Sequence, residues 1–259
     1  MTMNILRQRN VVLNTAKKHN HLRCGECPIR HRAVCAHCDK AELEQLDQIK
    51  TYRSFGPGET IVWSGEKLTF VGSVVVGVAT LSSTLSDGRR QMVGLLLPSD
   101  FLGRPGRVTA TYDVVAATDV TFCMFQKDEF ERMIARSPNL GNRLLEMTLD
   151  ELDSAREWML LLGRKTAREK IASLFVIMAR RDAALHQSAP RDGLHFSLHI
   201  TREAMADYLG LTIETVSRQI SALRREGIIE LVDARTVHVP NFEKLLDQSA
   251  DDADGGILA

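Results

Sequence analysis

The sequence predicts an α+β chain in which a β-barrel domain is followed by one long helix and then by a winged helix-turn-helix domain. Three observations predict this order. Short Val- and Thr-rich runs separated by turn residues fill residues 52–125, which is typical of a small barrel or sandwich. Residues 138–162 repeat apolar side chains at helical spacing. Residues 201–227 contain two short helical patterns around a glycine, and a predicted β-hairpin follows.

The composition restricts the class of protein and its partners. With 259 residues and 44% hydrophobic side chains, the chain can bury two cores. Its formal net charge is zero, so any nucleic-acid contact must use a local patch. Residues 1–22 lack the apolar core of a signal peptide, and no apolar run approaches the length of a membrane span. We therefore expect a cytoplasmic protein whose cysteines serve metal or redox chemistry before disulfides.

Residues 1–40 combine a basic arm with a cysteine-rich segment. Residues 1–23 carry basic side chains and no acidic one, and we interpret them as a solvated arm. Two Cys-x-x-Cys pairs follow, Cys24 with Cys27 and Cys35 with Cys38. Each pair sets two sulfurs on one tight turn, so the segment predicts a metal or iron–sulfur site. Four local thiolates could close a zinc site, or three of them could join a distant cysteine to hold a cluster.

Residues 41–137 are predicted to be a β-barrel sensor domain that begins with a short helix over residues 42–50. Cys123 falls in the last predicted strand, on the face opposite to Phe122 and Met124. It is either a small core residue or the distant fourth ligand of the cysteine-rich segment. No histidine lies between residues 50 and 137, which argues against a barrel enzyme with a histidine-held metal, and no catalytic constellation can be picked out.

Residues 138–163 are predicted to form a dimerisation helix. A narrow apolar seam runs along it, flanked by acidic side chains, and this pattern suits a coiled-coil-like contact with a second copy. The alternative is an ordinary helix packed on its own core. The seam consists of Leu145, Thr148, Leu152, Ala155, Met159 and Leu162.

Residues 164–245 are predicted to be a winged helix-turn-helix domain, which begins with a helix over residues 166–185. Thr201 and Thr212 suit the N-caps of its two short helices, and Gly210 permits the turn between them. The outer face of the second helix is polar and rich in donors, as the major groove of DNA requires. That face carries Glu214, Ser217, Arg218, Ser221 and Arg225. Residues 228–239 are the predicted wing, and residues 246–259 are a predicted disordered acidic tail.

The order of these parts over residues 20–245 resembles the cyclic-AMP receptor/FNR superfamily of transcription regulators. Residues 210–218, Gly-Leu-Thr-Ile-Glu-Thr-Val-Ser-Arg, resemble the recognition segment of the FNR branch, and residues 157–170 are similar to the FnrL-type anaerobic regulators. The resemblance implies a jelly roll of the cyclic-nucleotide-binding type. It also implies that Glu214, Ser217 and Arg218 read a TTGAT-type half-site in double-stranded DNA. The remaining residues of the expected DNA-binding set are Thr212, Thr215 and Ser221.

Members of this family hold an oxygen-labile [4Fe–4S] cluster on three N-terminal cysteines and one central cysteine. The resemblance therefore implies Cys24, Cys27, Cys35 and Cys123 as ligands, with Cys38 as the alternative. The sequence departs from the family pattern in the N-terminal segment. Seven residues separate Cys27 from Cys35, a longer gap than in the enterobacterial type. The residue after Cys27 is a proline, which has no N–H to offer a cluster sulfur.

The resemblance implies an oxygen-responsive regulator that binds TTGAT-N4-ATCAA-like palindromes as a homodimer at low oxygen and controls anaerobic genes. RNA polymerase is the implied partner, with residues 86–90 as a candidate activating surface. We expect no cyclic nucleotide, because residues 101–107 lack the Gly-Glu and Arg-Ser phosphate cassette. One rival is a zinc-stabilised or cluster-free regulator of the same fold. Another is an enzyme with an appended DNA-binding module, against which the missing barrel histidines weigh.

Overall fold

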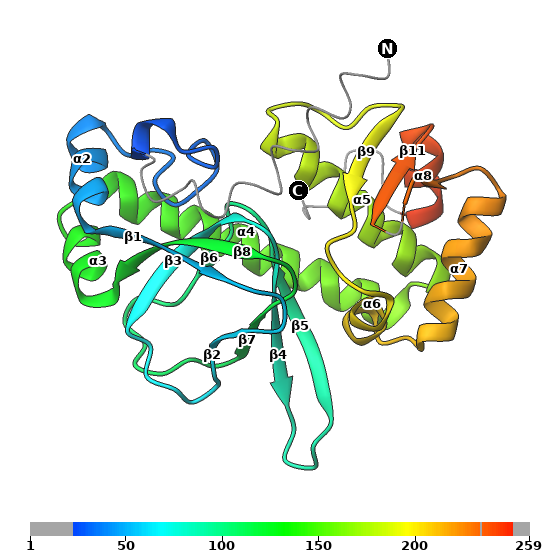
Figure 1. The fold of residues 1–259 in the computed structure, drawn as a ribbon, viewed down its shortest axis with the longest axis horizontal. Helices are drawn as coiled ribbons and strands as arrows, with labels where there is room; N and C mark the ends of the chain where they lie inside the picture. The colour runs from blue at the N-terminus through cyan, green and yellow to red at the C-terminus, as the bar shows by residue number, and fades with distance from the viewer. Residues whose placement is uncertain (1–22, 234, 251–259) are drawn as a thin grey trace. The chain divides into compact units, whose positions relative to one another are not determined.

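The computed structural model describes residues 23–233 and 235–250 (Figure 1). They form two compact units. The first comprises the described residues up to Ser83 together with Gly94–Leu145, and the second comprises Thr84–Val93 together with the described residues from Glu146 onwards. The division falls within the long helix α4 (Pro138–Arg164), so this helix belongs to both units. The predicted α+β class and the order of its parts are confirmed.

Two four-stranded sheets make up the predicted β domain, with strand orders β1-β8-β3-β6 and β2-β7-β4-β5. The strands are β1 (Lys50–Phe55), β2 (Thr60–Val62), β3 (Phe70–Val76), β4 (Ala79–Thr84), β5 (Arg90–Leu96), β6 (Phe101–Leu102), β7 (Asp113–Ala116) and β8 (Val120–Gln126). The Val-rich run after Phe70 forms two strands, because Gly77 turns the chain with a φ of 83°. The apolar core takes Phe55 and Phe122 from the first sheet and Val62 and Val114 from the second.

Two helices flank these strands in the sequence, α2 (Lys40–Ile49) and α3 (Lys127–Ile134). A capping box starts α2: the Asp39 side chain accepts the N–H of Glu42 at 2.8 Å, and the Glu42 carboxylate accepts the N–H of Asp39 at 2.8 Å. The prediction of a helix over residues 42–50 is thereby confirmed. The sequence did not predict α3, whose eight residues bury only Phe130 and Met133 and give too short a repeat.

The second unit contains the winged helix-turn-helix. Its helices are α5 (Ala167–Leu185), α6 (Arg202–Leu209), α7 (Ile213–Arg225) and α8 (Phe242–Ser249). Its sheet has the order β10-β11-β9, formed by β9 (Leu194–Ser197), β10 (Glu230–Leu231) and β11 (Thr236–Val239). Helix α5 confirms the predicted helix over residues 166–185, with Thr166 as its N-cap. The pair β10 and β11 confirms the predicted wing, and the sequence did not predict β9.

The prediction of a disordered tail over residues 246–259 is wrong for its first part. Helix α8 continues to Ser249, because Leu245 and Ser249 are buried and the Asn241 side chain caps the helix by accepting the N–H of Lys244 at 2.8 Å. Residues 251–259 of the predicted tail and residues 1–22 of the predicted basic arm lie outside the described part of the chain. Among the described residues, no helix is both long and apolar enough to cross a membrane.

Candidate metal centre and nucleic-acid interface

Each Cys-x-x-Cys pair is folded into a closed turn. The N–H of Cys27 donates to the carbonyl of Cys24 at 3.4 Å, and the N–H of Cys38 donates to the carbonyl of Cys35 at 3.2 Å. Cys24 begins the short 3-10 helix η2 (Cys24–Glu26), and its N–H donates to Oδ1 of Asp47 at 2.7 Å. The two sulfurs of each pair therefore leave one tight turn, as their spacing predicts.

Apolar side chains between the two turns anchor the segment in the first unit. Ile29, Ala33 and Val34 are buried, so the backbone between the turns is fixed by packing. Cys24 and Cys38 are buried as well, whereas Cys27 and Cys35 are half-buried.

Cys123 is buried in β8 on the face that is turned away from the apolar core. Phe122 and Met124 belong to the core cluster, and the alternation of a strand places Cys123 on the opposite side. It stands opposite Tyr52 of β1. Strand β8 also passes very close to β3 at Gly72, where an added Cβ would lie 2.4 Å from the carbonyl oxygen of Cys123. Only glycine fits there, and this fixes the path of the strand that carries the cysteine.

Electrostatic effects connect Cys123 to the cysteine-rich segment. Burial raises the pKa of the Cys123 thiol, and Cys27, Cys24 and Cys35 raise it further. Burial also raises the pKa of Cys24 to about 12 and that of Cys35 to about 11, and it raises the pKa of Cys27. The four thiols therefore share one neighbourhood and are protonated at neutral pH when no metal is bound.

Cys38 has different neighbours. Burial raises its pKa to about 12, and the next causes are Cys35 and then the carboxylates of Glu42 and Asp39. Negative charges on this side oppose a thiolate. Cys38 thus borders the other cysteines from the side of α2.

The chemistry of these donors fits a thiolate-bound metal centre, although the ligands are not preformed. Among the described residues, no group of three or more His, Cys, Asp or Glu side chains has the arrangement that holds a metal ion. The thiols are neighbours but do not converge on one point, as neutral thiols need not. A bound metal deprotonates coordinating thiols and draws them together, so binding would release protons and tighten the segment.

Two contacts tie the cysteine-rich region to the start of the long helix α4. Nη2 of Arg143 donates to the carbonyl of Arg32, between the two Cys-x-x-Cys turns, at 2.8 Å. The carboxylate of Glu42 accepts hydrogen bonds from the Ser137 hydroxyl and from Nδ2 of Asn139, the latter at 3.1 Å. A movement of the cysteine-rich segment would therefore act directly on the first turns of α4.

The seam predicted along α4 is mostly exposed to solvent. Leu145 is 58% exposed, Leu152 46% and Met159 66%, and Thr148 and Ala155 are exposed as well, while Leu162 is half-buried. Leu149 and Leu160 fall outside the predicted seam and are also exposed. A row of exposed apolar side chains on one helix is typical of a surface that a partner covers.

The opposite side of α4 contacts the winged helix-turn-helix domain within the second unit. Trp158 stacks on Tyr208 of α6, with ring centroids 4.1 Å apart and ring planes 23° apart. Leu161 is buried. The long helix thus presents one apolar side to solvent and packs another against its own domain.

Helices α6 and α7 form the predicted helix-turn-helix. The Thr201 side chain accepts the N–H of Ala204 at 3.1 Å, and the Thr212 side chain accepts the N–H of Thr215 at 3.2 Å. Gly210 caps α6 in the left-handed region, with a φ of 62°. These local signals confirm the predicted N-caps and turn. On α7, Val216, Ile220 and Leu223 are buried.

The opposite face of α7 carries the predicted DNA-binding residues. Glu214, Arg218 and Ser221 are exposed, as is the N-cap Thr212, whereas Thr215 and Ser217 are half-buried. The Ser221 hydroxyl donates to the carbonyl of Ser217 at 2.8 Å. The backbone N–H of Glu214 and the Thr212 hydroxyl hold the pKa of the Glu214 carboxyl below its usual value. Glu214 is therefore ionised at neutral pH and can accept hydrogen bonds from a base edge, while Arg218 can donate them.

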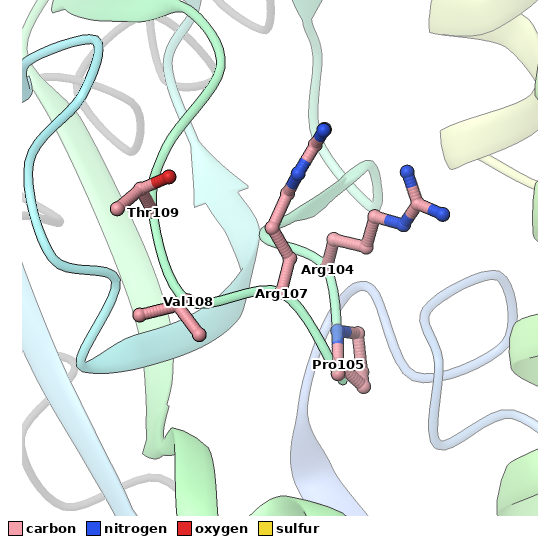
Figure 2. A pocket seen from close by; sticks show the side chains of 6 residues that line it. Arg104, Pro105, Arg107, Val108 and Thr109 are labelled. Carbon is pink, nitrogen blue, oxygen red and sulfur yellow. The ribbon is translucent and has the colours of Figure 1, made fainter.

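A shallow pocket lies in the stretch where the sequence lacks a phosphate cassette (Figure 2). It is lined by Arg104, Pro105, Gly106, Arg107, Val108 and Thr109. Figure 2 shows the side chains of Arg104 and Arg107 extending from the same loop. Nη1 of Arg107 donates to Oγ1 of Thr111 at 2.5 Å. The six lining residues offer two guanidinium groups and one hydroxyl but no carboxylate.

Comparison with known proteins identifies the class. The family described as "Crp-like helix-turn-helix domain" matches residues 169–248. The family described as "Cyclic nucleotide-binding domain" matches residues 52–137. The chain belongs to the CRP/FNR family of transcription regulators, and it is therefore not an enzyme.

Within this family the chain is an FnrL-like transcriptional activator. It is 64% identical to the transcriptional activator protein FnrL of Cereibacter sphaeroides over 91% of this chain and 95% of that protein. It is 40% identical to the nitrogen fixation regulation protein FixK of Bradyrhizobium diazoefficiens, over 81% of this chain and 86% of that one. The solved structure of FixK2 from Bradyrhizobium japonicum superposes with a TM-score of 0.70 at 32% identity, covering 79% of this chain and all of that one.

Sequence reasoning missed the charged and aromatic residues that surround the thiols. Asp47, Lys50 and Tyr52 lie beside the cysteines, and Arg143 holds the segment from α4. The spacing of Asp47 and Lys50 at the end of a helix allows an ion pair, but nothing local indicates that it lies next to Cys24.

Proposed function

We propose that this FnrL-like regulator is oxygen-responsive and assembles a [4Fe–4S] cluster on Cys24, Cys27, Cys35 and Cys123. As a homodimer at low oxygen it would bind palindromic TTGAT-N4-ATCAA-like DNA and control anaerobic genes. One observation carries the proposal. The thiol of Cys123, which is distant in the sequence, lies on the outer face of its strand and is coupled electrostatically to Cys27, Cys24 and Cys35.

The four proposed ligands come from two separate elements. Three belong to the cysteine-rich segment and the fourth to β8, so a shared centre would hold the segment against the barrel. When bound, the cluster supplies a centre that oxygen can destroy, and this makes the segment's position depend on oxygen. The hydrogen bonds of Arg143 and Glu42 would then transmit a change in the segment's position to the start of α4.

DNA reading is assigned to the exposed face of α7. The ionised Glu214 would accept from a cytosine amino group, and the fork of Arg218 would donate to O6 and N7 of a guanine. Two half-sites on one face of the duplex lie about 34–36 Å apart, so two recognition helices are required. The exposed seam of α4 provides the surface on which two copies pair. The turn at residues 86–90 is the proposed contact with RNA polymerase, and Asp87 and Arg89 form an exposed ion pair in it.

The test is anaerobic purification followed by exposure to air. The expected protein is brown, contains iron and sulfide, and loses its broad visible absorption in air together with its affinity for the palindrome in a fluorescence-anisotropy assay. A colourless protein that contains zinc and binds DNA equally well with and without oxygen would contradict the proposal. It would favour the zinc-stabilised regulator, in which Cys38 replaces Cys123.

A further inference from the structure

Lys50 is a nearly buried cation beside the candidate metal ligands, and we infer that its ammonium group is the counter-ion of the metal centre. The inference rests on the proposed function, which assigns Cys24, Cys27, Cys35 and Cys123 as ligands. Only 10% of the Lys50 side chain is exposed. Burying an ammonium group costs free energy unless a negative charge compensates it, so the position of Lys50 requires an explanation.

The ion pair of Lys50 with Asp47 explains this burial in part. Nζ of Lys50 donates to Oδ1 of Asp47, and the same oxygen accepts the N–H of Cys24 at 2.7 Å. Asp47 lies in the last turn of α2, where the helix dipole disfavours a carboxylate. Its side chain is 37% exposed, so water already solvates much of its charge. The buried cation is therefore paired with a carboxylate that could remain hydrated without it.

The charge of Lys50 acts on three of the thiols, while Asp47 contacts Cys24. Burial is the largest cause that raises the pKa of Cys24, Cys27 and Cys123, and Lys50 acts against it at all three. Asp47 acts in the opposite direction at Cys24, through a hydrogen bond and through its charge. The ammonium of Lys50 thus lies close enough to three of the proposed ligands for its charge to act on them.

The backbone places Lys50 next to both elements that supply these ligands, because Asp47 connects it to Cys24 and its strand pairs with β8. It follows α2 directly and is the first residue of β1, the strand that pairs with β8. Its Nζ lies 5.8 Å from the centroid of the Tyr52 ring, and Tyr52 stands opposite Cys123. Burial and then Cys123, Cys27 and Cys24 raise the pKa of the Tyr52 phenol, so this residue stays neutral and forms an uncharged wall.

A metal centre with four thiolates gains from such a neighbour. Four thiolates outweigh the positive charge of a [4Fe–4S] core or of a zinc ion, so the assembled centre is an anion. In a partly buried site of low dielectric constant, a nearby ammonium stabilises that anion far more than it would in water. Lys50 ligates nothing in this arrangement. It is a positioning and charge-compensating residue that slows the loss of metal.

The experiment compares full-length chains reconstituted anaerobically with ferrous iron and sulfide. Iron per chain is measured first, and then the rate at which a chelator removes it. Lys50→Met removes the charge and keeps an unbranched apolar side chain, while Lys50→Arg keeps the charge. Lys40→Met is the matched control, because Lys40 is exposed at the opposite end of α2 from Lys50. The double variant Lys50→Met with Asp47→Asn removes the carboxylate that the single change leaves without its partner.

We expect Lys50→Met to lose iron several-fold faster than the wild type. Lys50→Arg and Lys40→Met should lose iron at rates close to that of the wild type. The double variant should still lose iron faster than the wild type. The inference is overturned if Lys50→Met keeps iron as the wild type does, or if Lys50→Arg fails equally, since that marks a packing role. Full restoration in the double variant also overturns it, because the defect then comes from Asp47 alone. Thermal unfolding of the metal-free variants identifies a general loss of folding.

The same experiment separates this inference from the proposed function. If the wild type retains zinc and no iron or sulfide, the proposed function fails. The Lys50 comparison is then made on zinc release, because zinc held by four thiolates is also an anion. A wild-type chain that retains neither metal overturns both.

Discussion

The exposed seam of α4 allows the energetics of dimerisation to be worked out from one residue, Leu152. Full burial of a leucine side chain contributes about 1.5–3 kcal/mol. Leu152 is 46% exposed in the single chain, so roughly half of that contribution, about 0.7–1.5 kcal/mol, remains for a partner to supply. Twofold symmetry buries the residue twice, which gives about 1.5–3 kcal/mol per dimer.

Leu152→Ala should therefore weaken the dimer by roughly tenfold to a hundredfold, since about 1.4 kcal/mol corresponds to a factor of ten. Leu152→Glu should abolish it, because acidic side chains already flank the seam and two new carboxylates would face each other. Neither change touches the cysteines, so iron content should stay that of the wild type. DNA affinity should fall with the dimer population, because one recognition helix reaches only one half-site.

The assay is sedimentation equilibrium of the cluster-loaded protein over a concentration series, with iron content measured on the same samples. Val108→Glu is the control, since Val108 is 66% exposed on a loop of the β domain and lies outside α4. An unchanged dissociation constant for Leu152→Glu would show that the copies do not pair through this seam. Equal weakening by Val108→Glu would show that any added charge dissociates the dimer.

Three further predictions concern the ligands and the reader. Cys35→Ser should lose the cluster while Cys38→Ser keeps it, and iron analysis with the reverse result would exchange their roles. Arg218→Ala should weaken DNA binding by roughly 1–3 kcal/mol and relax the base preference at one base pair of each half-site. Binding to a set of half-sites with single base substitutions tests this. An unchanged base preference would show that Arg218 does not contact a base. Trp158→Leu should lower DNA affinity without changing the dimer dissociation constant, because it removes the ring stack on Tyr208. Fluorescence anisotropy and sedimentation of one sample distinguish the two effects. An unchanged DNA affinity would show that the stack does not position the helix-turn-helix.

Local signals in the sequence predicted the helix-turn-helix well. Thr201, Gly210 and Thr212 each satisfy a neighbouring backbone group or a special backbone conformation, and such requirements can be read from a few adjacent residues. Helix α8 was missed for the opposite reason. Leu245 is buried only because the rest of the unit covers it, and the acidic composition near the chain end outweighed the short apolar pattern of Phe242, Leu245 and Leu246.

The candidate metal site could be predicted only in part. Alternation along β8 separates Cys123 from Phe122, but it does not say which face of the strand is the core. That decision depends on the pairing of β8 with β1 and β3, which brings together residues far apart in the sequence. The same holds for Lys50, whose charge matters through its place between α2 and β1. Spacing therefore identified the candidate thiols, and the charges around them required the fold.

The coupling between the cysteine-rich segment and α4 leads to a last prediction, which concerns Arg143. Its guanidinium donates to the carbonyl of Arg32 between the two Cys-x-x-Cys turns, and it lies two residues before Leu145 of the seam. A hydrogen bond from a charged donor contributes about 1.5–3 kcal/mol, and allosteric couplings are of similar size, about 1–3 kcal/mol.

If this contact carries the signal, Arg143→Met should leave the cluster in place and reduce the effect of the cluster on the dimer. The quantity to measure is the ratio of dimer dissociation constants with and without the cluster, by sedimentation of anaerobic and air-bleached protein. We expect this ratio to move toward one by several-fold to tenfold, which corresponds to about 1 kcal/mol of coupling. Asn142→Ala, at an exposed neighbouring position, is the control. A ratio equal to that of the wild type would leave the contacts of Glu42 with Ser137 and Asn139 as the route. Equal dimerisation with and without the cluster in the wild type would instead mean that the switch is a rearrangement within a permanent dimer, because association could then carry no signal.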